Sequence, residues 1–105
     1  MSLVYLGYIY EVGLSVESDL STAESYYRRA YEGGSIGGLF GLGSIYLRLQ
    51  NYQEAEKMFL LGSDKQDMRS MYWLARVYLK DHNNVEKQQK AIRLLERSYS
   101  MGHIL

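Results

Sequence analysis

The stretch LGYIYEVG, residues 6–13, recurs twice in the chain, as LGSIYLRL at residues 42–49 and as LARVYLKD at residues 74–81. In each copy a tyrosine follows a leucine by four residues, a spacing that puts both side chains on one face of a helix. The copies are 36 and 32 residues apart, which indicates an architecture built from a repeated unit. The position after the leucine is always small, and is occupied by Gly7, Gly43 and Ala75.

A second helical segment follows each copy, marked by a small residue, a large apolar one four positions later and another small one after three more. Polar residues that favour N-caps and turns separate the segments. At the first break Ser21 and Glu24 have capping-box spacing, and Asp19 is the other candidate start of that helix. The three marker positions are Ala23, Tyr27 and Ala30, then Ala55, Phe59 and Gly62, then Ala91, Leu95 and Ser98.

These patterns predict six helices in three hairpins, over residues 2–36, 37–67 and 68–102, within one domain that spans residues 1–105. Self-similarity at a mean period of 34 residues is typical of a helical solenoid, in which each unit buries its apolar face against its neighbours. The chain has no proline and no run of alternating apolar and polar residues, so a β-sheet is not expected.

The second hairpin, LGSIYLRLQNYQEAEKMF, resembles the tetratricopeptide repeat. The first and third hairpins have four more residues between their helices, and this longer form resembles the Sel-one-like (Sel1-like) repeat, a family of the tetratricopeptide-repeat-like superfamily. Ala75 and Gln66 depart from the pattern, because both stand where a glycine is expected. The resemblance implies an all-α fold, a right-handed superhelical solenoid of three antiparallel helix hairpins whose first helices line a concave face.

The same resemblance implies a non-enzymatic adaptor that binds a protein or peptide on its concave face. Bacterial proteins with such repeats often serve envelope, secretion or host-interaction systems. Two alternatives stay open, a helical repeat that binds single-stranded RNA and a structural spacer within a larger protein.

Charge and composition narrow these classes. Twelve basic and twelve acidic residues give a formal net charge of zero, which argues against a nucleic-acid partner, and no apolar run is long enough for membrane insertion. The absence of cysteine excludes disulfides and thiolate chemistry, and leaves a soluble protein of the cytoplasm or the periplasm equally open.

Catalytic and metal-binding motifs are not found. The two histidines, His82 and His103, do not form a helical pair of ligands. Acidic residues around the first break, Glu11 and Glu24 among them, lack the spacing of a calcium loop and are interpreted as caps or solvated charges. The glycine-rich run GSIGGLFGLG lacks the strand-to-helix context of a phosphate loop. We therefore predict no enzyme activity, no metal and no cofactor.

Aromatic and basic side chains mark a candidate binding face. Tyr8 and Tyr72 are expected to point inward as anchors. Arg69, Arg76 and Lys80 share one stripe of their helix, and arginine fits carboxylates well, so an acidic peptide is the predicted ligand. A merely solvated stripe of charges stays open as the other interpretation. The predicted face comprises Tyr8, Glu11, Arg48, Arg69, Tyr72, Arg76 and Lys80.

Neither end of the chain has the polar capping helix that usually closes a solenoid. Ser2 stands where an incoming repeat would place its small residue, and GHIL at residues 102–105 resembles the start of a fourth unit. We expect a piece of a longer array, with apolar surface left uncovered near Leu94, Ile104 and Leu105 and self-association through the terminal repeats.

The small residue of each first helix has a predicted cause. Gly7 is expected to meet the second helix near Ala23 and Tyr27, too close for a large side chain. Ala75 at the same position of the third unit suggests that smallness, rather than a positive φ, is required. Alanine at Gly7 or Gly43 is therefore expected to be tolerated, and leucine to disrupt packing.

Overall fold

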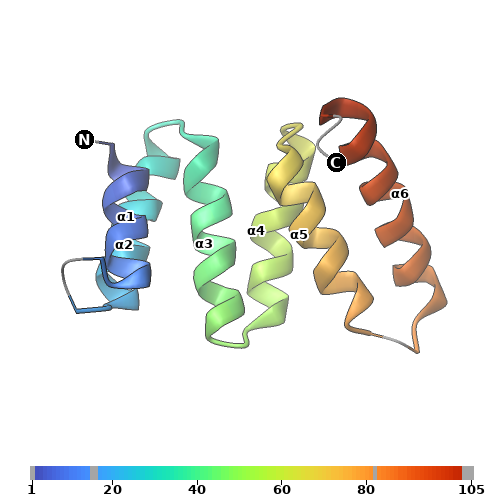
Figure 1. The fold of residues 1–105 in the computed structure, drawn as a ribbon, viewed down its shortest axis with the longest axis horizontal. Coiled ribbons are helices and arrows are strands. Elements are labelled where there is room, and N and C mark those ends of the chain that lie inside the picture. The colour runs from blue at the N-terminus through green and yellow to red at the C-terminus, as the bar shows by residue number, and fades with distance from the viewer. Residues whose placement is uncertain (1, 15–16, 82, 103–105) are drawn as a thin grey trace.

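The computed structural model describes residues 2–14, 17–81 and 83–102. This part of the chain is all helical, and Figure 1 shows its helices arranged in chain order along the long axis of a molecule measuring 40 × 27 × 25 Å. Consecutive helices pack as three antiparallel hairpins, so the predicted all-α solenoid is confirmed. The helices are α1 (Leu3–Val12), α2 (Leu20–Glu32), α3 (Ile36–Arg48), α4 (Tyr52–Asp64), α5 (Met68–Leu79) and α6 (Val85–Gly102).

Side-chain caps fix where several helices begin. The carboxylate of Asp19 accepts hydrogen bonds from the N–H of Thr22 at 3.2 Å and from its hydroxyl at 2.7 Å. These bonds to Thr22 lower the pKa of Asp19. Of the two starts that the sequence left open for α2, the structure therefore adopts Asp19. Equivalent side-chain caps of other helices come from Ser2, Asn51 and Asn84.

The first helices of the hairpins approach one another more closely than the second helices do. α1 contacts α3 and α3 contacts α5, whereas within the described residues α2 does not reach α4 and α4 does not reach α6. The first helices therefore lie on the inner side of the array, as the family resemblance implied. The predictions for His82, His103, Ile104 and Leu105 concern positions outside the described residues.

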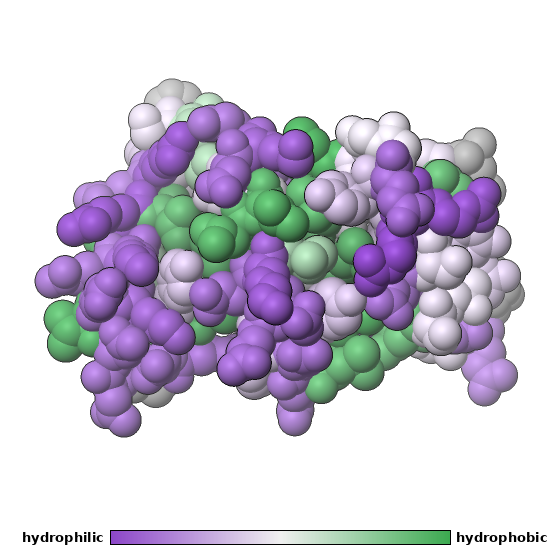
Figure 2. Space-filling view, turned by 180° about the vertical axis from the view of Figure 1, so that it is seen from behind, coloured by the Kyte–Doolittle hydropathy of each residue, from purple (hydrophilic) through white to green (hydrophobic). Residues whose placement is uncertain are grey.

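Seen from behind, much of the surface is hydrophilic, with hydrophobic side chains exposed between the charged ones (Figure 2). Those apolar groups do not form a membrane segment: none of the described helices combines the length and the apolar composition needed to cross a bilayer.

Tyr27 is packed between two helices, and a glycine faces its ring from each of them. A Cβ atom added to Gly7 of α1 would lie 2.7 Å from ring carbon Cδ1, and one added to Gly41 of α3 would overlap the same ring. Phe59 repeats the arrangement against Gly43. Both rings are buried, at 3% exposure for Tyr27 and 0% for Phe59. Glycine is thus required because the rings occupy the space of a methyl group.

The prediction that alanine is tolerated at Gly7 and Gly43 is therefore wrong. Neither glycine has a positive φ, so smallness is indeed the requirement. The requirement is stricter than expected, however, since Tyr27 cannot retreat from a methyl at Gly7 without striking Gly41 on its other side.

The third hairpin has a different pair of residues at these two positions. Ala75 replaces the glycine, and Leu95 stands where the other hairpins have an aromatic ring. Leu95 packs against the core cluster that contains the buried Ala75. Across the three hairpins the sizes of the two residues are therefore complementary: glycine with a ring, twice, and alanine with leucine, once.

We predict that Gly43→Ala lowers the free energy of unfolding. Overpacking against Phe59 costs roughly 1–3 kcal/mol, and the gain in helix propensity of about 1 kcal/mol offsets only part of it. Gly33→Ala is the control, because its Cβ would meet nothing closer than 3.4 Å and its φ of −84° suits alanine. Urea denaturation measures both; a Gly43→Ala variant as stable as wild type would refute the overlap.

Candidate binding face

Arg76 of α5 lies over two aromatic rings of the same helix. Its guanidinium carbon is 4.7 Å from the ring centroid of Trp73 and 5.8 Å from that of Tyr72. The two rings meet edge to face, at an interplanar angle of 89°. Attraction between a cation and ring faces restrains the guanidinium without consuming its N–H donors. The group is thus held in place and remains able to donate hydrogen bonds.

Two further cations of the predicted stripe also contact rings. Nζ of Lys80 lies 5.3 Å from the ring centroid of Tyr52, and the guanidinium carbon of Arg69 lies 4.8 Å from that of Phe40. Each of these contacts joins α5 to the preceding hairpin, because Phe40 belongs to α3 and Tyr52 to α4. These cation–ring contacts therefore help to hold the second and third hairpins together.

The cations of α5 differ in how far their charge is already neutralised. Arg69 forms an ion pair with Asp67, at 3.5 Å from Nε to Oδ1. For Arg76 and Lys80, no carboxylate of the described residues lies within 4.0 Å. Both side chains are exposed. Two adjacent turns of α5 thus present positive charge that an external carboxylate can reach.

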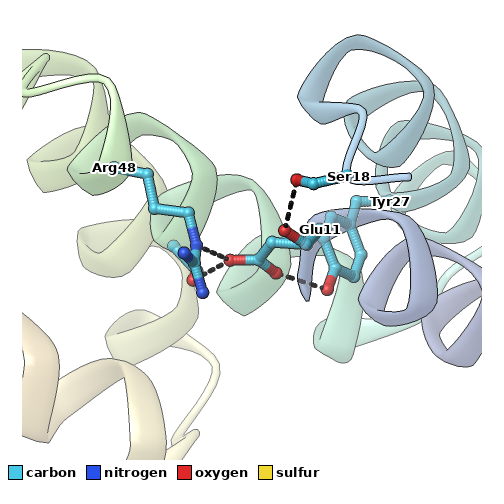
Figure 3. Close-up of polar contacts among 5 residues, drawn as sticks. Glu11, Ser18, Tyr27 and Arg48 are labelled. Carbon is cyan, nitrogen blue, oxygen red and sulfur yellow. Dashed lines mark hydrogen bonds and ion pairs between the residues drawn. The ribbon is translucent and has the colours of Figure 1, made fainter. Parts of the chain in front are cut away.

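Glu11 has a different environment from the one predicted. Its side chain is only 4% exposed and links the first two hairpins (Figure 3). Oε1 accepts a hydrogen bond from the hydroxyl of Tyr27 at 2.8 Å, and Oε2 accepts from Ser44 Oγ at 2.5 Å and from Arg48 Nε at 2.8 Å. Its backbone carbonyl accepts from Ser18. Glu11 is therefore a buried connector of α1, α2 and α3.

This geometry corrects two predictions. Glu11 was expected on the exposed concave face, or as a solvated charge, and it is neither, because α2 and α3 cover it. Arg48 is half exposed, at 49% of its side chain, but its Nε is committed to Glu11. Tyr8, also on α1, is 47% exposed, and α1 does not contact α5. The structure thus places Arg69, Tyr72 and Arg76 on α5 and Lys80 at its C-cap, and leaves Tyr8 apart from them.

Sequence reasoning missed the rings beneath the cations. Trp73 stands three residues before Arg76, so helical spacing alone could have indicated that contact. Tyr52 and Phe40 belong to another hairpin, and nothing in the repeat pattern announces that they meet Lys80 and Arg69.

Burial also changes the ionisation of Tyr27. Loss of solvent around the hydroxyl, together with its hydrogen bond to the carboxylate of Glu11, raises the pKa of Tyr27 far above that of an exposed tyrosine. The protonated hydroxyl is thus strongly favoured in the folded state, and it remains a donor to Glu11 throughout the physiological range.

The fold defines a protein built from repeated helical hairpins. A sequence model of the Sel1 repeat matches residues 1–35, 37–67 and 69–103, nearly the whole chain, and the chain therefore belongs to the Sel1 repeat family. Sel1 repeats are non-catalytic and generally take part in protein–protein interaction. No curated protein and no solved structure gave a significant match.

We predict that Glu11→Gln lowers the free energy of unfolding by about 1.5–3 kcal/mol, the usual contribution of hydrogen bonds to a charged group. An amide cannot accept from three donors while its own N–H₂ group faces Arg48. Glu86→Gln makes the same change on α6, where the carboxylate is 79% exposed and pairs only with Lys90 one turn away. That control should lose less than about 1 kcal/mol. Equal losses in chemical denaturation would contradict the connecting role of Glu11.

A second prediction concerns alkaline pH. Because folding raises the pKa of Tyr27, its stabilising contribution is complete below the unfolded value of about 10 and declines as the pH rises beyond it. Tyr27→Phe keeps the ring and removes the titrating hydroxyl. The stability difference between wild type and Tyr27→Phe should therefore narrow above pH 10 in urea titrations. A constant difference at all alkaline pH values would argue against the buried hydrogen bond.

Proposed function

We propose that this protein is an interaction module that binds an acidic peptide segment of another protein along α5. The observation that carries the proposal is the pair Arg76 and Lys80: both cations rest against aromatic rings, and neither meets a carboxylate among the described residues. The carboxylate of a bound Asp or Glu side chain would form an ion pair with these cations.

Several other cations of the chain are already paired. Arg28, Lys57 and Lys90 each form an ion pair with a carboxylate one turn away on their own helix. Such exposed pairs contribute little to stability but occupy the cation. Arg76 and Lys80 have no such partner within 4.0 Å among the described residues, which favours a recognition role over simple solubility.

Aromatic side chains beside the cations supply the apolar part of the proposed site. Tyr72 is 44% exposed and lies next to Arg76, so a peptide could pack an apolar side chain against the ring while a neighbouring carboxylate meets the guanidinium. Exposed tyrosine and arginine are the residue types that most often dominate binding energy in protein interfaces. Holding the guanidinium on Trp73 before binding reduces the entropy lost on association.

A selection from a displayed library of random peptides tests the proposal. We predict that the selected peptides are rich in Asp and Glu, and that Arg76→Glu weakens their binding at least about tenfold in fluorescence anisotropy, as expected for a lost charged hydrogen bond. Arg93→Glu on α6 is the matched control, an exposed arginine away from α5, and should leave binding unchanged.

The alternatives give distinct results in the same assay. Selected peptides without acidic enrichment, or affinities unaffected by Arg76→Glu, would contradict the proposal. Tighter binding of labelled single-stranded RNA than of any peptide would point to the RNA-binding alternative instead. If neither peptides nor RNA bind, a structural spacer becomes the better description.

A further inference from the structure

At both junctions between hairpins, a first helix packs on the second helix of the preceding hairpin through small residues. Ser70 of α5 packs on Gly62 of α4, so closely that a Cβ on that glycine would overlap the serine. At the preceding junction, Gly38 of α3 occupies the place of Ser70, where a Cβ would lie 2.5 Å from the backbone oxygen of Tyr27. A small residue at the start of an incoming helix therefore meets the end of the preceding second helix.

The third hairpin presents the corresponding surface, with other side chains, and no following helix covers it among the described residues. Ser98 of α6 stands at the position of Gly62 in α4. It lines an open pocket of about 560 Å³ between α5 and α6. Leu95, the counterpart of the fully buried Phe59, is only partly buried here. The pocket is lined by Met68, Arg69, Tyr72, Trp73, Leu95, Ser98 and Tyr99.

The other end of the molecule presents the matching incoming helix. Four positions of α3 and of α5 that pack on the preceding hairpin correspond, by the repeat spacings of 36 and 32 residues, to Ser2 and to three residues of α1. In α5 the residues that correspond to Leu6 and Ile9 are Leu74 and Val77. Their exposed fractions are only 1% and 8%, because the preceding hairpin covers them. At the N-terminal end this surface is open, with Tyr5 50% exposed. The four residues are Ser2, Tyr5, Leu6 and Ile9.

We propose that α1 of a second copy of this chain docks into the pocket between α5 and α6, so that Ser2 faces Ser98 at the positions that Ser70 and Gly62 hold between the second and third hairpins. The interface continues the junctions already present inside the molecule. The only charged residue of α1 is the buried Glu11, so docking would desolvate no charge on the incoming helix. The zero net charge of the chain adds no overall repulsion between copies.

The geometry of this contact differs from that of an ordinary dimer. The two surfaces lie at opposite ends of the molecule, so the contact is head to tail and leaves one of each surface free (Figure 1). Such contacts produce growing chains rather than closed pairs. Arg76 and Lys80 do not line the pocket, so assembly would leave these two cations accessible, although it would cover Tyr72 and Arg69.

Mixing two blocked variants tests this arrangement. Tyr5→Glu blocks the incoming surface and Tyr99→Glu the receiving one, both at exposed positions. By light scattering from micromolar to millimolar concentration, wild type should grow in average mass with concentration. Each variant alone should remain at the monomer mass of 12.2 kDa. Their mixture should reach twice that mass and stop, because one intact pair of surfaces remains. Leu60→Glu, an exposed apolar position of the middle hairpin, should assemble like wild type.

Monomeric wild type at all concentrations, a mixture that fails to pair, or a Tyr5→Glu variant that still dimerises would each overturn the proposal. Cysteine pairing provides a readout that does not depend on variant stability, since the chain has no cysteine of its own. Under oxidation, Ser2→Cys mixed with Ser98→Cys should give a disulfide-linked heterodimer in excess of either homodimer. Ser21→Cys on the exposed start of α2, mixed with Ser98→Cys, is the control that should not link. Equal linking of both mixtures would also refute the docking.

Discussion

A flat aromatic ring pressed against a glycine is the contact on which the stacking of these helices depends. Tyr27 lies between Gly7 and Gly41, and Phe59 lies against Gly43, in each case without room for one more carbon atom. Each glycine inside a helix costs about 1 kcal/mol relative to alanine. That cost is offset by burying a large ring and by bringing two helices close together. At these positions the stability gained from packing between helices therefore outweighs the stability lost through the low helix propensity of glycine.

The polar contacts of the core depend on the same ring. Because Tyr27 is fixed between α1 and α3, its hydroxyl donates a hydrogen bond to the carboxylate of Glu11. That carboxylate also accepts hydrogen bonds from Ser44 and Arg48 of the next hairpin. The buried charge is thus surrounded by three donors, which is the condition for burying a carboxylate without a large loss of stability. The first junction is therefore both apolar and charged, whereas at the second junction Phe59 shares a core cluster with residues of α5 and cations of α5 and its C-cap lie over rings of the second hairpin.

The repeat pattern predicted the helices and their pairing well, because a leucine and a tyrosine four residues apart report directly on helical periodicity. It also identified Gly7 as a contact point with Tyr27. It did not predict that alanine would be too large, since the distance between helices is set by ring orientation rather than by spacing along the chain. Nor could it place Glu11, whose three donors lie 16, 33 and 37 residues away and belong to no local motif.

The central claim is that the sizes of two facing residues are matched in every hairpin, and a double-mutant cycle at Gly43 and Phe59 tests it most directly. Gly43→Ala combined with Phe59→Leu gives the second hairpin the residues that the third hairpin has at these two positions, Ala75 and Leu95. The account predicts that the double variant is more stable than the sum of the two single losses, by at least about 1 kcal/mol in urea denaturation. Strictly additive losses would contradict it.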